Sequence, residues 1–262
     1  MSRFAIGRLT LELSVPSTST AATLFERWGR FADAGVPRTR VEVILSGKIA
    51  HAGPRHMPLV ETASGGGVSL HGEDFVATVS PDRKHVELRQ ADTRYPIEAV
   101  AKWLLADALA PTQGLLVHGV GIAFSNQAFV FVGPSGAGKS TLAALCQNEG
   151  MTLLADELVA LERAPNGGFV VQGTPWNSGS PMRAWLCELG TLAWGAAHRL
   201  ESLGAAELLR TLLPNTLLAD PSPPGRAAAF RAASALLTEV PAKTLTFARK
   251  NGLGALLAGE LP

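Results

Sequence analysis

The sequence predicts an α/β fold, and three adjoining features carry that prediction. Residues 128–132 form an unbroken apolar run rich in β-branched and aromatic residues, the composition of a strand buried on both faces. A glycine-rich segment follows, and beyond it apolar residues recur at helical spacing until Gly150. A strand, a tight loop and a helix in this order are typical of α/β proteins.

The glycine-rich segment, residues 133–141, reads GPSGAGKST and fits the phosphate-binding pattern G-x-x-x-x-G-K-[ST]. Glycines let the backbone form a concavity of N–H donors, and the following helix adds the positive end of its dipole. We expect Lys139 to reach the β and γ phosphates and Ser140 to hold magnesium. A chance glycine-rich turn is the alternative, which the flanking strand and helix disfavour. The predicted nucleotide contacts are Gly133, Pro134, Ser135, Gly136, Ala137, Gly138, Lys139, Ser140 and Thr141.

The composition of the 262 residues bounds the class of protein. An apolar fraction of 47% argues against disorder, and no apolar run approaches the length of a membrane helix. The N-terminal sequence lacks the pattern of a signal peptide, so we expect a cytoplasmic protein without a membrane partner. A net charge of +1 without a block of like charges gives no reason to expect nucleic-acid binding. Cys146 and Cys187 are expected to be reduced side chains in apolar surroundings.

Two domains are expected. Residues 1–95 predict an antiparallel β-rich lobe with one helix, whose apolar face carries Leu24, Trp28 and Phe31 and which ends at Gly35. The strand patterns there span residues 4–15, 41–45, 68–70, 75–79 and 85–88.

Residues 96–262 predict the second domain, which carries the phosphate loop. Helical patterns span residues 96–109, 203–213 and 227–237, and a short helix is expected near the end. Residues 220–225 contain three prolines and predict a loop. The strand patterns span residues 115–117, 121–124, 128–132, 152–155, 184–189, 191–193 and 241–248.

Two adjacent acids, Asp156 and Glu157, follow the apolar strand at 152–155. In a nucleotide site one carboxylate can approach magnesium while its neighbour accepts a proton from an attacking hydroxyl. A solvated acidic turn is the alternative, and the nearby phosphate loop favours the functional interpretation. His118, judged by its sequence surroundings alone, is typical of a structural histidine.

Other candidates keep simpler interpretations beside functional ones. A loop at 176–180 is predicted near strand ends, where ligands bind in open α/β sheets, and a packed turn is an equal alternative. Lys243, Arg249 and Lys250 could neutralise phosphate charge, but solvated side chains are the simpler expectation. The tryptophans Trp103, Trp185 and Trp194 are expected in the core.

Taken together, the segments His118–Gly121, 133–141 and 153–157 resemble the catalytic core of HPr kinase/phosphorylase and its relatives. Their order and spacing match the family pattern of histidine, phosphate loop and acidic pair. The family shares its fold with ATP-dependent phosphoenolpyruvate carboxykinase, so the resemblance implies a P-loop kinase core of that type joined to the N-terminal β-rich lobe. A weaker likeness, at residues 173–176, is to a turn in HPr-kinase-like proteins of peptide-biosynthesis clusters.

The resemblance implies a role for each matching residue. His118 matches the histidine near the transferred phosphoryl group, Lys139 the phosphate-loop lysine and Ser140 the magnesium-binding serine. Asp156 would serve the metal side, and Glu157 would take the proton of the acceptor serine. The family pair is Asp-Asp, so Glu157 places its carboxylate one methylene further out. The family also has an acid in a later signature segment, where residues 174–181, TPWNSGSP, contain none.

The sequence therefore predicts an ATP- and Mg²⁺-dependent kinase that transfers the γ-phosphoryl group to a serine hydroxyl of a peptide or small protein. A biosynthetic precursor peptide is one such acceptor. Two alternatives remain: a kinase of a free small hydroxyl compound such as serine, and a nucleotide-binding ATPase or sensor that transfers nothing. The identity of the acceptor, the preference for ATP over other donors and the oligomeric state stay open.

Overall fold

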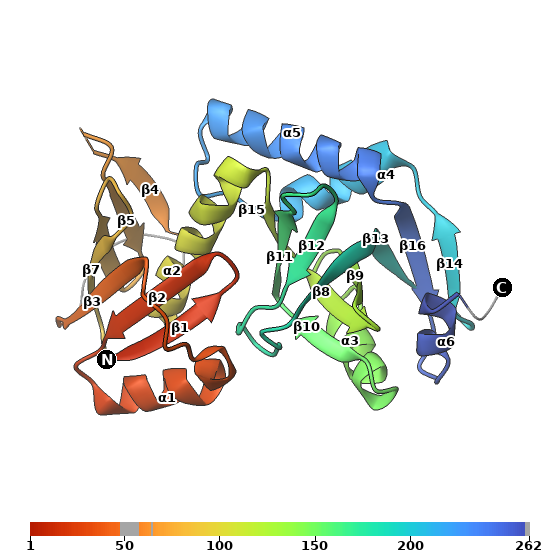
Figure 1. The fold of residues 1–262 in the computed structure, drawn as a ribbon, viewed down its shortest axis with the longest axis horizontal. Helices are drawn as coiled ribbons and strands as arrows, with labels where there is room; N and C mark the ends of the chain where they lie inside the picture. The colour runs from red at the N-terminus through yellow and green to blue at the C-terminus, as the bar shows by residue number, and fades with distance from the viewer. Residues whose placement is uncertain (48–57, 64, 260–262) are drawn as a thin grey trace. The chain divides into compact units, whose positions relative to one another are not determined.

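The computed structural model describes residues 1–47, 58–63 and 65–259, and the chain divides into two compact units. The first comprises Met1–Ala108 with Ala219–Pro221, and the second comprises Leu109–Leu218 with the C-terminal segment from Ser222. Each unit combines a sheet with helices, which confirms the predicted α/β class at that level (Figure 1).

The first unit is built on a mixed sheet with the strand order β1-β2-β3-β7-β6-β5-β4. The pairings β2–β3 and β3–β7 are parallel, which corrects the expectation of an antiparallel lobe. The helix between β2 and β3 explains the first of these pairings, since a strand–helix–strand crossover returns the chain in the same direction. The strands are β1 (Ser2–Ile6), β2 (Leu9–Ser14), β3 (Thr39–Leu45), β4 (Leu59–Thr62), β5 (Val68–Gly72), β6 (Phe75–Val79) and β7 (His85–Gln90).

Helix α1 (Thr18–Trp28) is the crossover helix of this unit. Ser17 caps it by accepting a hydrogen bond from the N–H of Thr20, and the helix ends before a short 3-10 turn, Gly29–Phe31. Trp28 is fully buried and meets Phe4 edge to face, with ring centroids 5.4 Å apart. The single strand expected at 4–15 is instead a hairpin, because Gly7 adopts φ 58° and reverses the chain.

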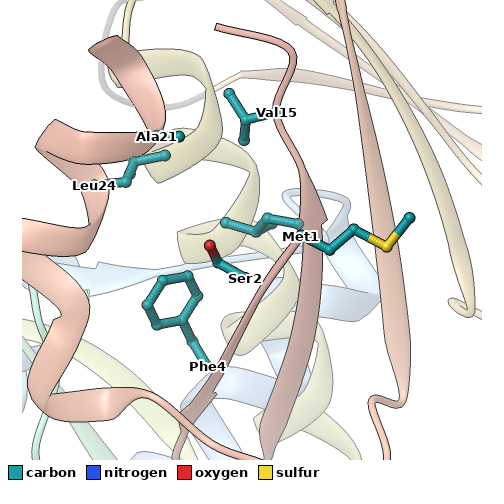
Figure 2. Close-up of a pocket in the computed structure, with 7 residues that line it drawn as sticks. Met1, Ser2, Phe4, Val15, Ala21 and Leu24 are labelled. Atoms are coloured by element: carbon teal, nitrogen blue, oxygen red, sulfur yellow. The ribbon is translucent and has the colours of Figure 1, made fainter. Parts of the chain in front are cut away.

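A small pocket lies between α1 and the first two strands (Figure 2). Its volume is about 30 Å³, enough for roughly one water molecule. Phe4, Val15, Ala21 and Leu24 line it together with Ser2, and its small volume leaves no room for a larger ligand.

Helix α2 (Tyr95–Leu109) belongs almost entirely to the first unit, whereas residues 96–109 were expected to open the second domain. The contacts of its polar side chains explain this difference. Arg83 donates to Asp107 at 3.1 Å and places its guanidinium 5.6 Å from the centroid of the Trp103 ring, and Arg27 pairs with Glu98 at 3.2 Å. Sequence periodicity found the helix but not the partners that assign it.

The second unit is built on a larger sheet with helices on both of its faces. Its main strand order is β10-β8-β11-β12-β13-β16-β14, with β15 paired to β8 and β9 paired to both β8 and β13. The strands are β8 (Leu115–Phe124), β9 (Gln127–Val132), β10 (Thr152–Ala155), β11 (Leu158–Arg163), β12 (Phe169–Gln172), β13 (Arg183–Trp194), β14 (Arg199–Ser202), β15 (Thr216–Leu217) and β16 (Ala242–Phe247).

An apolar core lies on each face of this sheet. Helices α3 (Lys139–Asn148) and α6 (Leu253–Leu257) contribute Leu142, Cys146 and Leu253 to one core. Helices α4 (Ala205–Leu212) and α5 (Pro223–Glu239) contribute Leu208 and Leu236 to the other. A sheet covered on both faces explains why β9 reads as a continuous apolar run.

Several boundaries in this unit differ from the sequence prediction. Segments 115–117 and 121–124 form the single strand β8, and 184–189 and 191–193 both fall within β13. Helix α5 begins at Pro223, inside the expected loop, because Ser222 accepts from the N–H of Gly225 and proline is favoured in a first helical turn.

Both cysteines are free, with Cys146 buried and Cys187 partly buried. In the described part of the chain, no helix is long and apolar enough to cross a membrane.

The short helix α6 is tied to α3 by one side chain. The carboxylate of Glu149, just past the end of α3, accepts from the N–H groups of Gly252, Leu253 and Gly254 at 3.0, 3.2 and 2.8 Å. A carboxylate in this position satisfies donors that the first turn of a helix leaves without a helical partner.

We expect Glu149→Ala to lower the free energy of unfolding by about 1–3 kcal/mol, because it leaves three backbone donors without their acceptor. Urea denaturation would measure the change. The matched control is Gln147→Ala, an exposed position in the last turn of α3, which should leave stability within about 0.5 kcal/mol. Equal stability of the two variants would show that the Glu149 contacts contribute nothing net.

Candidate functional site

The phosphate-loop motif lies between β9 and α3, as its sequence pattern requires. Gly136 and Gly138 adopt φ 82° and 102°, a region that side chains with a Cβ rarely occupy. Gly138 is also the N-cap of α3 and makes no side-chain capping bond, so the first N–H groups of the helix are not satisfied by a cap. The loop thus has the backbone form of an anion-binding turn.

Lys139 folds back over this loop. Its Nζ donates to the carbonyl oxygens of Gly133 at 2.8 Å and Pro134 at 2.9 Å. Burial lowers the pKa of the Lys139 ammonium from its ordinary value, and the charge of Asp156 acts in the opposite sense. The lysine therefore stands at the loop with its charge partly desolvated, which strengthens its attraction for an anion.

Asp156 lies directly after β10, next to the first turn of α3. The hydroxyl of Ser140 donates to Asp156 Oδ1 at 3.3 Å. Two oxygen groups from separate elements therefore meet beside the loop. Hydroxyl and carboxylate oxygens are ligands that magnesium accepts, and this metal needs only one or two from protein when phosphates and water complete its shell. The pair Ser140 and Asp156 fits such an ion.

The loop at residues 176–180, for which the sequence allowed two interpretations, holds Asp156 by hydrogen bonds. Asn177, at φ 60°, donates from Nδ2 to Asp156 Oδ2 at 3.1 Å. The N–H of Asp156 in turn donates to the carbonyl of Ser178 at 3.1 Å. The loop is thus a packed turn that also positions a site residue, whereas Trp176 beside it is fully buried. Its glycines make the packing feasible, because a Cβ at Gly179 would collide with the carbonyl oxygens of Thr174 and Leu154.

Burial raises the pKa of the Asp156 carboxyl above its ordinary value. The hydrogen bond from Ser140, the charge of Lys139 and the hydrogen bond from Asn177 lower it, and Glu157 adds to the rise. Asp156 is therefore a partly desolvated carboxyl group whose charged form is stabilised by three identified neighbours.

Strand pairing along β8 brings the backbones of His118 and Glu157 close together. The first half of β8 pairs with β11, where His118 lies opposite Leu158, and the second half pairs with β10, where Gly121 lies opposite Ala155. The chain thus passes from one partner strand to the next at Asp156 and Glu157. The N–H of Gly119 donates to the carbonyl of Glu157 at 3.0 Å. This pairing brings His118 and the acidic pair, which are distant in sequence, to one position on the sheet.

The structure also shows side chains behind the loop that sequence reasoning did not assign to it. A Cβ at Gly138 would lie 2.7 Å from Phe247 and 2.9 Å from Trp194, so these two rings pack directly against the loop. Trp194 is 47% exposed and Trp185 is 40% exposed, which corrects their expected place in the core, while Trp103 is buried as expected. An apolar residue late in a strand pattern carried no signal that would have distinguished Trp194.

Comparison with known proteins finds likenesses among solved structures. No protein-family model matches the chain, and a search of curated proteins finds no match. Among solved structures, the Hpr(Ser) kinase/phosphatase from Coxiella burnetii matches with 10% identity and a TM-score of 0.30, covering 55% of this chain and 91% of that one.

Removing the neighbours of Asp156 should move its titration in a defined direction. Lys139→Ala and Asn177→Ala each delete an interaction that lowers the Asp156 pKa, so each variant should titrate at higher pH than the wild type. Carboxyl ¹³C chemical shifts followed against pH would measure this. An unchanged or lowered pKa in Asn177→Ala would contradict the assigned hydrogen bond.

Gly179→Ala should displace the loop at 173–180 and destabilise the protein by about 3 kcal/mol, because the new methyl group meets backbone oxygens. Thermal unfolding would measure it. Gly47→Ala is the control, since a Cβ there has nothing within 4 Å. Equal melting temperatures for the two variants would contradict the tight packing of this loop.

Proposed function

We propose that this protein is an ATP- and Mg²⁺-dependent kinase that transfers the γ-phosphoryl group to a serine hydroxyl of a peptide or small protein. The observation that carries the proposal is the meeting of Ser140 with Asp156 at 3.3 Å beside Lys139, at the phosphate-loop end of α3. The motif by itself indicates only phosphate binding. The neighbouring carboxylate of Asp156 adds a group that could hold the metal needed for phosphoryl transfer.

Phosphoryl transfer depends chiefly on positioning and on electrostatic stabilisation, because the protein has little covalent chemistry to perform. In this proposal the backbone of residues 133–141 and the Lys139 ammonium hold the phosphates. Lys139 would release the carbonyls of Gly133 and Pro134 and direct its N–H donors to phosphate oxygens. Ser140 and Asp156 would hold magnesium, which neutralises phosphate charge when bound.

Glu157 is assigned as the base. As the acceptor oxygen bonds to the γ-phosphorus, the bond to the bridging oxygen of ADP breaks and the hydroxyl proton passes to the Glu157 carboxylate. His118, which the pairing of β8 brings to the same part of the sheet, would orient the transferred group. The choice of a serine acceptor rests on the resemblance of the three sequence motifs, and free serine would use the same groups.

The test is transfer of label from γ-labelled ATP in the presence of magnesium. Water alone, free serine and a panel of serine-containing peptides are offered as acceptors, and the position of the label is determined. Label on a peptide hydroxyl supports the proposal. Label on free serine alone moves the assignment to a small-molecule kinase, and release to water alone identifies an ATPase.

Glu157→Gln should lower the rate of transfer by about 10²- to 10⁴-fold while nucleotide affinity stays near that of the wild type, because the base acts only in the chemical step. Single-turnover rates and calorimetric binding would separate the two effects. Glu207→Gln, at an exposed position on α4, is the matched control and should transfer at the normal rate. A Glu157→Gln protein with normal transfer would refute the assignment of the base.

A further inference from the structure

Strands β9, β13 and β16 run parallel to one another and end at the same edge of the second unit's sheet (Figure 1). β13 lies between β9 and β16, with Thr191 opposite Val132 and Trp194 opposite Phe247. The carboxyl ends of parallel strands form the edge where ligands bind in open α/β sheets. Trp194 is thus the last residue of the strand next to the one that delivers the phosphate loop.

Trp194 is held in place yet exposed. Its ring packs against Phe247 with centroids 4.5 Å apart and an interplanar angle of 33°, and its six-membered ring approaches Gly138. Phe247 is fully buried, whereas nearly half of Trp194 remains accessible. A partly exposed aromatic residue that its neighbours hold in place offers a rigid apolar surface at small cost in side-chain entropy.

Arg249 accompanies this ring. Its guanidinium lies 5.4 Å from the centroid of Trp194, within the range of a cation–π contact. Among the described residues, no carboxylate forms a salt bridge with it. A planar cation without an acidic partner next to an exposed ring is suited to a ligand that is both aromatic and anionic.

The segment that carries Arg249 is fixed at both ends. His198 donates from Nε2 to the carbonyl of Lys250 at 3.0 Å and accepts at Nδ1 from the N–H of Ala248 at 3.4 Å. A few residues later, Glu149 holds the N–H groups of Gly252–Gly254. These bonds order the backbone on either side of Arg249 without using its side chain, which is the arrangement of a preorganised binding residue.

We propose that Trp194 and Arg249 form the nucleobase subsite of this protein, with Trp194 stacking on the purine ring of a nucleoside triphosphate and Arg249 flanking it. The inference rests on the proposed function in one respect: the triphosphate lies in the loop of residues 133–141. Contact between Trp194 and Gly138 makes the platform continuous with that loop. Stacking accepts any base, so ATP and GTP should bind with similar affinity and both more tightly than inorganic tripolyphosphate.

The test compares the affinities of ATP, GTP and tripolyphosphate, measured by calorimetry in magnesium buffer. Trp194→Leu keeps an apolar side chain over Phe247 but removes the stacking surface. We expect it to weaken ATP and GTP binding by about ten- to a hundredfold and to leave tripolyphosphate binding within about twofold. Arg249→Lys, which keeps the charge and loses the planar group, should weaken ATP binding severalfold.

Trp185→Leu is the matched control, because Trp185 lies on the same strand with similar exposure but at the opposite end. It should bind all three compounds as the wild type does. Thermal unfolding checks that each variant folds. As a second measurement, ATP should quench tryptophan fluorescence in the wild type and in Trp185→Leu but not in Trp194→Leu, while tripolyphosphate should quench none of them.

The outcomes separate the subsite from the function on which it rests. Equal wild-type affinities for ATP and tripolyphosphate would overturn the nucleobase subsite and leave the phosphate site standing. An equal loss for ATP and tripolyphosphate in Trp194→Leu would also overturn it, since the ring would then only support the loop. A wild-type protein that binds neither compound would overturn both the subsite and the proposed function.

Discussion

The parallel alignment of β9, β13 and β16 is the constraint on which the rest of the second unit depends. Because these strands run in one direction and in a fixed register, the phosphate loop, Trp194 and the segment after Phe247 all emerge at one edge. Glycine at position 138 is then required twice, by its left-handed backbone and by the rings packed against it. The loop is shaped by its own residues and also by two strands that the motif does not contain.

A second constraint comes from β8, which pairs with different strands along its length. β11 takes its first half and β10 its second, so the chain between those two strands must cross at Asp156 and Glu157. This arrangement leaves Asp156 and Glu157 only partly buried, with Asp156 beside the first turn of α3. The loop at 173–180 then braces Asp156 through Asn177, and its glycines allow the close approach.

The parts of the fold that depend on local pattern were predictable from the sequence. Residues 128–132, the glycine-rich turn and the helix after it have local signatures, and so does the strand that precedes Asp156. The predictions that were wrong concern features that depend on residues distant in sequence. Tertiary contacts that periodicity does not encode determine three of these features. They are the parallel pairing of β3 with β7, the assignment of α2 to the first unit through Arg27 and Arg83, and the exposure of Trp194. The sequence places Asn177 in a predicted loop, but only the structure links it to Asp156.

The hydrogen bonds from Lys139 to the carbonyls of Gly133 and Pro134 give the loop an internal competitor for any anion that enters it. An incoming ligand has to replace two existing bonds before it gains new ones, and the net gain from such an exchange is small for each bond. A monovalent or compact anion would recover little of that loss. A chain of linked phosphates would offer several oxygens at once, so the occupied lysine would act as a threshold that favours polyphosphates over smaller anions.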